Sequence, residues 1–215
     1  MVEVNRRRFL ASAATAAVAA LADDEKLVDG GYAAVEKPGT PARSVPVVPP
    51  GSGGADGFGL RCVGCQLCVE QCPNRVLRPL GGRHPGAPLG TTQPVMGFEN
   101  GYCRPECTAC GDVCPSGAIR RLDPGQKKNI RIGRAVWNRN LCLAATEGVE
   151  CHACERHCLG GAIKLVPSGS GKDAPKVPVV DESKCIGCGA CEHLCPARPM
   201  PAIVVEGLAR HVACR

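Results

Sequence analysis

The chain has 215 residues, of which 44% are hydrophobic and only 3% aromatic, and its formal net charge is +6. Because 17 of the hydrophobic residues are cysteines, roughly 36% of the chain remains for a hydrocarbon core, which is too little without metal or disulfide cross-links. The sequence has no run of 18 apolar residues, which excludes an ordinary transmembrane helix, and no basic stripe with interleaved aromatic residues, so nucleic-acid binding is unsupported.

The first 22 residues have the order of an export signal. Arginines fill positions 6–8, Phe9 and Leu10 follow, and an Ala-rich segment of 12 residues (11–22) ends in the small-x-small pattern Ala-Leu-Ala. Basic, apolar and small residues in this order are typical of a secretory signal, and paired arginines followed by Phe-Leu resemble the twin-arginine signal. We therefore expect residues 1–22 to engage the twin-arginine export machinery, which carries a protein that is already folded and loaded with its cofactor.

Residues 23–59 are rich in proline and glycine. Five prolines lie between positions 38 and 50, and five glycines lie between positions 51 and 59. This composition offers few side chains for a core and predicts an extended tether with no fold of its own. A loop pinned along the folded part is the alternative.

Sixteen cysteines form four groups of four, and the intervals between the groups contain 30, 27 and 26 residues, which is an internal repeat. The first and fourth groups follow C-x2-C-x2-C-x3-C-P, the run of bacterial [4Fe–4S] ferredoxins. The second group has one extra residue in its first gap, and the third has eight residues there and a leucine in place of the proline. The groups are Cys62, Cys65, Cys68 and Cys72; Cys103, Cys107, Cys110 and Cys114; Cys142, Cys151, Cys154 and Cys158; and Cys185, Cys188, Cys191 and Cys195.

The spacing indicates iron–sulfur chemistry. Three thiols two residues apart let a short loop wrap one cube, and a fourth, about one helical turn further on, can reach a neighbouring cube. Structural zinc uses separate Cys pairs, and a disulfide scaffold conflicts with the odd number of cysteines. We therefore expect four [4Fe–4S] clusters with these sixteen cysteines as iron ligands. Cys214, outside the groups, is expected to be a free thiol, and the histidines inside groups three and four are expected to be solvated.

The segments between the groups predict β-hairpins. Each reads as a short apolar run, a polar turn and a second apolar run; residues 117–119 and 134–137 flank one such turn, and residues 161–166 and 177–181 flank the next. The cysteine loops open short helices. The predicted class is α+β, with residues 60–215 forming two ferredoxin-like modules of the bacterial 2[4Fe–4S] type, with small antiparallel sheets and short helices.

Two pairings of the groups are compatible with two modules. The regular form shared by groups one and four favours a nested arrangement, in which group one pairs with group four and group two with group three. Sequential pairing, one with two and three with four, is the alternative, since short connections favour neighbours.

The chain resembles the NapG/MauM group of periplasmic ferredoxin-type proteins. The resemblance rests on the twin-arginine start, the four cysteine groups, and above all the third group, which opens Cys142-Leu143 and reaches Cys151 through a long gap. It implies a periplasmic protein with four [4Fe–4S] clusters that relays electrons from a membrane quinol dehydrogenase-type subunit to a periplasmic redox enzyme. In one branch of the family this enzyme is nitrate reductase, and in the other it belongs to methylamine oxidation.

Substrate turnover by the chain itself is not expected, since the sequence offers no general base, nucleophile or open metal position. Two other functions fit the cysteine pattern. One is an electron-transfer subunit of a molybdopterin oxidoreductase or a hydrogenase. The other is a structural protein that holds zinc.

Overall fold

The structure, a computed structural model, describes residues 41–82, 84, 88–171 and 174–214. The predicted export signal and the first part of the predicted tether, residues 23–40, lie outside the described residues. All described residues belong to one compact unit. Within them, no helix combines the length and the apolar character needed to cross a membrane.

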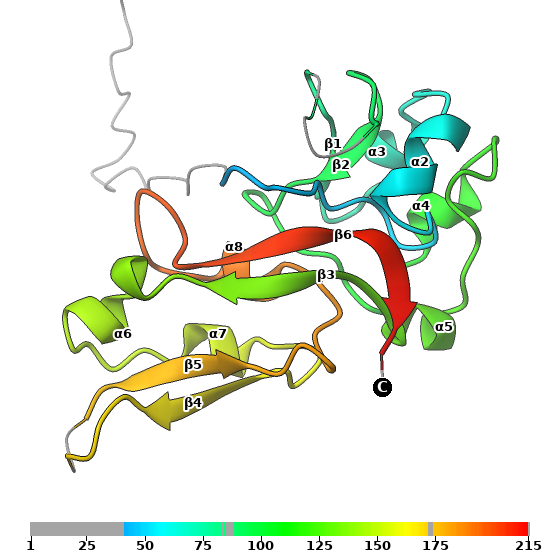
Figure 1. Ribbon diagram of the computed structural model, residues 1–215. Coiled ribbons are helices and arrows are strands. Elements are labelled where there is room, and N and C mark those ends of the chain that lie inside the picture. Colours follow the sequence, from blue (N-terminus) through cyan, green and yellow to red (C-terminus); the bar gives the residue numbers. More distant parts are fainter. Residues whose placement is uncertain (1–40, 83, 85–87, 172–173, 215) are drawn as a thin grey trace, which may run out of the picture. The chain divides into compact units, whose positions relative to one another are not determined.

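Within the described part of this unit, the β-structure consists of three two-stranded antiparallel sheets (Figure 1). The strands are β1 (Leu77–Pro79) with β2 (Pro94–Met96), β3 (Ile130–Trp137) with β6 (Ile203–Ala213), and β4 (Ile163–Pro167) with β5 (Lys176–Val180). The helices are short: α2 (Ala55–Arg61), α3 (Leu67–Glu70), α4 (Ala109–Asp112), α5 (Pro124–Lys128), α6 (Leu143–Thr146), α7 (Ala153–Arg156), α8 (Ala190–His193) and the 3₁₀ turn Arg139–Leu141. The α+β class with small antiparallel sheets and short helices is confirmed.

Two of the three predicted hairpins form, and one does not. The β1–β2 and β4–β5 pairs are hairpins that follow cysteine groups one and three. The hairpin predicted after group two is wrong, because β3 pairs with the distant strand β6, with Ala135 opposite Val205 (Figure 1). The run 117–119 packs elsewhere: the N–H of Arg120, just after it, donates to the Gly51 carbonyl at 3.0 Å.

The proline-rich segment 41–52 crosses the folded part as a strap. Val47 and Val48 are fully buried, the Val47 carbonyl accepts the Met96 N–H at 2.8 Å, and the Val45 carbonyl accepts the Gly207 N–H at 3.0 Å. The strap therefore bonds to β2 and to β6. The prediction of a tether is wrong from Pro41 onward, and the pinned loop is correct. Its prolines and valines supply core side chains, and proline loses little conformational entropy on folding.

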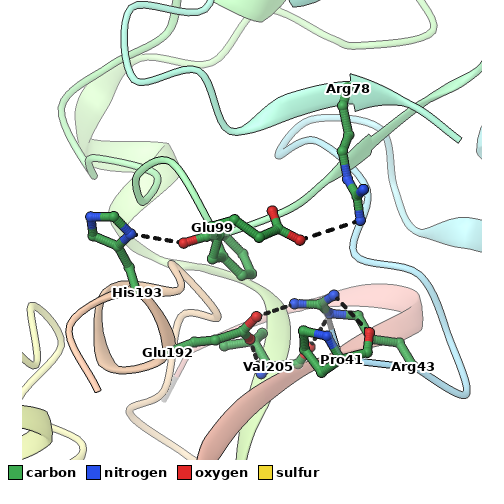
Figure 2. A network of polar contacts seen from close by, with 8 residues as sticks. Pro41, Arg43, Arg78, Glu99, Glu192, His193 and Val205 are labelled. Atoms are coloured by element: carbon green, nitrogen blue, oxygen red, sulfur yellow. Dashed lines mark hydrogen bonds and ion pairs between the residues drawn. The ribbon is translucent and has the colours of Figure 1, made fainter. Parts of the chain in front are cut away.

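One ion pair locks the strap onto the fourth cysteine group (Figure 2). The Arg43 guanidinium contacts the Glu192 carboxylate in α8, and the two side chains are 6% and 3% exposed. Arg43 also donates to the carbonyl of Val205 at 2.8 Å. The buried core is continuous from Val47 to Val205, so strap, helices and sheets share one hydrophobic cluster.

Candidate metal centres

The third cysteine of every group lies in a four-residue helix. Cys68, Cys110, Cys154 and Cys191 stand in α3, α4, α7 and α8 respectively. The two regular groups share their backbone: Gly64 and Gly187 have φ of 68° and 76°, and Gln66 and Gly189 begin the helices with φ of 66° and 83°. The irregular groups begin theirs at Thr108 and His152, with φ near −118° in both. These turns bring three thiols of one group to one side of a loop.

The thiols of groups one and two form two mixed sets. Site I is Cys62, Cys65 and Cys68 with Cys114: burial raises the pKa of Cys68 to about 11, and the charges of Cys62, Cys114 and Cys65 add to that rise. Site II is Cys103, Cys107 and Cys110 with Cys72, which together border one cavity. Each group thus contributes three thiols to one site and its last thiol to the other, as in two-cluster ferredoxins.

Groups three and four form two further mixed sets in the same way. Site III is Cys142, Cys151 and Cys154 with Cys195, which border a second cavity. Site IV is Cys185, Cys188 and Cys191 with Cys158: burial raises the pKa of Cys191, and the charges of Cys188, Cys185 and Cys158 add to that rise. All sixteen predicted cysteines therefore fall into four sets of four.

The nested pairing is wrong, and the sequential pairing is correct. Cys72 borders the cavity of Cys103, not a site of group four, and Cys195 borders the cavity of Cys142. The helices agree with this, because α3 packs on α4 and α7 packs on α8. The nested prediction relied on the similar form of groups one and four, but local backbone form does not select a packing partner, and short connections favour neighbours.

Backbone N–H groups point at the fourth cysteine of three groups. The N–H groups of Ile119, Ala162 and Ala202 donate to the sulfurs of Cys114, Cys158 and Cys195 at 3.4, 3.1 and 3.3 Å. Although burial raises it, the pKa of Cys114 is lowered overall by hydrogen bonds from Ile119, Ser116 and Ala118. Such donors stabilise thiolates and tune the potential of a bound cluster.

Two buried polar groups fit a cluster of negative charge. The Lys127 side chain borders site II and is 6% exposed. The indole N–H of Trp137, which borders site III, is buried and has no hydrogen-bond partner among the described residues. A cluster held by thiolates supplies the negative charge that the buried Lys127 ammonium requires. It also supplies the acceptor sulfurs that the Trp137 indole N–H requires. The residues present therefore fit iron–sulfur clusters.

Burial of the thiols at the sites opposes their ionisation in the absence of a metal. It raises the pKa of Cys110, Cys154 and Cys188 to about 12. Iron would supply the positive charge that makes ionisation favourable there, since a coordinating thiol is deprotonated outright. Among the described side chains, no group of three or more His, Cys, Asp or Glu is spaced to hold a single metal ion; at sites II and III the four thiols border a cavity.

Sites II and IV meet directly. The Cys103 N–H donates to the Cys188 carbonyl at 2.9 Å, and one small cavity is bordered by both cysteines together with Lys127. The Cys103 charge also contributes to the raised pKa of Cys188, after burial and the charge of Cys185. This contact joins the two pairs of sites.

Three buried groups at or beside the sites are not marked by any sequence motif. They are Arg43, Lys127 and the indole N–H of Trp137. Tertiary packing buries them, and the spacing of residues in the sequence does not reveal such burial. Of the remaining residues considered there, Cys214 is unbonded to other cysteines, and its N–H donates to the Asn129 carbonyl at 2.8 Å. His193 contacts the Phe98 carbonyl at 2.8 Å.

Comparisons with known proteins agree with this geometry. A family model described as a 4Fe–4S dicluster domain matches residues 61–118, which hold groups one and two, and residues 149–198, which hold group four and the last three cysteines of group three. A methylamine utilization ferredoxin-type protein MauM of Methylophilus methylotrophus is 36% identical over 160 residues, covering 72% of this chain and 69% of its own. The ferredoxin-type protein NapG of Escherichia coli is 34% identical over 171 residues, covering 76% and 71%. The MauM protein of Paracoccus denitrificans is 32% identical over 201 residues, covering 90% and 84%.

Proposed function

Because the chain belongs to the family of MauM- and NapG-like ferredoxin-type iron–sulfur proteins, we propose that it is a periplasmic electron relay with four [4Fe–4S] clusters. The sixteen cysteines of sites I to IV are the iron ligands. A bound [4Fe–4S] cluster supplies one-electron transfer. The chain's own residues hold the clusters, bury four of the sixteen thiols (Cys68, Cys185, Cys191 and Cys195) and set the order of the sites.

The hydrogen bond between Cys103 and Cys188 carries this proposal. Sites I and II share groups one and two, sites III and IV share groups three and four, and the Cys103–Cys188 contact is the junction. Electrons therefore pass in the order I, II, IV, III or the reverse. A storage protein needs no such order, whereas a relay does.

The two end sites have the exposure that partners need. Cys65 of site I is exposed, and its neighbours Leu60 and Val63 are 86% and 71% exposed. Near site III, Leu141 and Val149 are 38% and 48% exposed. Apolar side chains beside a redox centre suit docking of another protein. We assign these ends to a membrane quinol dehydrogenase-type donor and to a periplasmic redox enzyme as acceptor.

Anaerobic purification of the full chain together with whatever binds it tests the proposal. We expect about 16 iron and 16 sulfide per chain, four of each per cube, and a copurifying membrane quinol-oxidising subunit. About half that iron content would reject four clusters. Copurified molybdopterin or nickel would identify a subunit of a molybdopterin enzyme or hydrogenase, and a colourless zinc protein would reject electron transfer.

The relay order has its own test in the Cys188→Ala variant. Quinol-oxidising membranes should reduce every cluster of the wild-type chain, and the sites beyond the junction should be reduced slowly in the variant. The control is Cys214→Ala, which lies outside the four sites and should behave as the wild type. Equal reduction of all remaining clusters in Cys188→Ala would reject the proposed order.

A further inference from the structure

Lys127 has its charged end inside the protein. It stands in the last turn of α5, whose start is fixed by the Asp123–Gln126 capping box. Its ammonium donates to the Arg104 carbonyl at 2.7 Å and also to the Cys107 carbonyl. The next residue, Lys128, is exposed. Helix α5 therefore places one ammonium against site II and leaves its neighbour in solvent.

The ammonium of Lys127 has no carboxylate partner within the described residues. Two carbonyl oxygens satisfy hydrogen bonds but do not neutralise a buried charge, which is costly unless it is paired. The thiols of site II border the same cavity as Lys127 and, once ionised, would supply negative charge there. Burial raises the pKa of Cys103, while the charge of Lys127 and a hydrogen bond from it act in the opposite direction, and its charge also opposes the rise at Cys110.

We propose that Lys127 sets the potential of site II, and that its ammonium favours the reduced state of the cluster held there. Reduction adds one electron and therefore one negative charge to the cluster, and a buried cation stabilises the more negative state more strongly. The electron comes from the cluster of site I or site IV, which is oxidised in the same step. This inference rests on the proposed loading of the four sites.

The position of Lys127 favours the electron on site II over site IV, at the contact between these two sites. Its side chain borders the cavity of site II and the small cavity shared by Cys103 and Cys188. The hydrogen bonds of its ammonium to backbone carbonyls, however, go to the loop of group two, at Arg104 and Cys107. The charge is therefore asymmetric between the two sites that meet, and it holds the electron on the side of site II.

Redox titration of the loaded full chain, followed by electron paramagnetic resonance, tests this. The variants are Lys127→Met, Lys127→Gln, Lys127→Arg and the control Lys128→Met. Gln retains a hydrogen-bond donor without the charge, and Arg retains the charge. Iron content is measured on every sample, and the transition of site II is identified as the one missing in Cys72→Ala.

We expect Lys127→Met and Lys127→Gln to bind the wild-type amount of iron. At a fixed ambient potential, their reduced-to-oxidised ratio at site II should fall at least tenfold, which is about 59 mV for one electron. Lys127→Arg and Lys128→Met should leave all ratios within about twofold, a margin well below that effect.

Fully loaded neutral variants with unchanged transitions would overturn the proposal. Loss of one cluster from both neutral variants would also overturn it, because Lys127 would then be needed to hold the cluster and not to set its potential. A wild-type chain that binds no cluster at site II would reject the proposed function itself, which is a separate result.

Discussion

The guanidinium of Arg43 contacts the carboxylate of Glu192, a residue 149 positions later in the chain, and both side chains are buried. The other carboxylate oxygen of Glu192 accepts the Val205 N–H at 2.6 Å (Figure 2). Glu192 directly follows Cys191 of site IV. One carboxylate thus joins the strap, the helix of a candidate cluster site and strand β6.

Replacing Arg43 by alanine should therefore destabilise the loaded protein strongly. Glu192 would remain buried without its partner, which costs about 3–5 kcal/mol. For a chain of this size, 3 kcal/mol lowers the unfolding temperature by roughly 6–12 °C. The control is Arg78→Ala, which breaks the partly exposed Arg78–Glu99 pair at 3.5 Å and should cost at most about 1 kcal/mol. Similar losses in the two variants would contradict the role assigned to Glu192.

The pairing of the cysteine groups predicts the iron content of double variants. Cys72 and Cys103 belong to one site, so Cys72→Ala with Cys103→Ala should remove one cluster and leave about 12 iron atoms. Cys72→Ala with Cys62→Ala should remove two clusters and leave about 8. Anaerobic iron and sulfide analysis distinguishes these values. A remainder of about 12 for Cys72→Ala with Cys185→Ala would restore the nested pairing.

His211 should make the protein less stable in mild acid. Burial lowers the pKa of this histidine in β6 to about 4. Because the unfolded chain takes up a proton near pH 6.5 and the folded protein does not, the free energy of unfolding falls as the pH decreases from 6.5 towards 4, by about 3 kcal/mol in total. Unfolding temperatures at pH 7.5, 6 and 5 measure the effect. His211→Gln should flatten this dependence, and an equally steep profile in the variant would assign it to other groups.

Removal of the clusters should increase the fluorescence of Trp137. This is the only tryptophan of the chain, and it borders site III. A cluster that absorbs near-ultraviolet light at such close range quenches the indole. Anaerobic chelation should raise the emission several-fold, in step with the loss of cluster absorbance. Emission that stays constant while iron is lost would place the indole away from any cluster.

The arginine pair at the N-terminus should decide export. Arg6→Lys with Arg7→Lys is expected to leave folded, iron-loaded protein in the cytoplasm, because the export receptor reads the pair. Cell fractionation with iron analysis of each fraction measures this. Charge is preserved in the variant, so a general effect of basic residues is controlled. An unchanged periplasmic yield would reject the twin-arginine route.

The sequence alone determined the local structures of this protein, namely the cysteine loops with their short helices and the β4–β5 hairpin. The spacing within each cysteine group predicts three thiols on one short loop, and each loop indeed opens a four-residue helix. Apolar runs on both sides of a polar turn predict the β4–β5 hairpin. These features depend on residues close together in the chain, where backbone geometry leaves few alternatives.

Tertiary structure decided the features that depend on distant residues. Spacing alone did not identify the partner of the last thiol in each group; Cys72 reaches site II because α3 packs on α4. Nor did it reveal that β3 pairs with β6, that the proline-rich strap enters the core, or that Lys127 is buried while Lys128 is exposed. Each outcome reflects competition among surfaces for burial, and that competition is settled only when the whole chain packs.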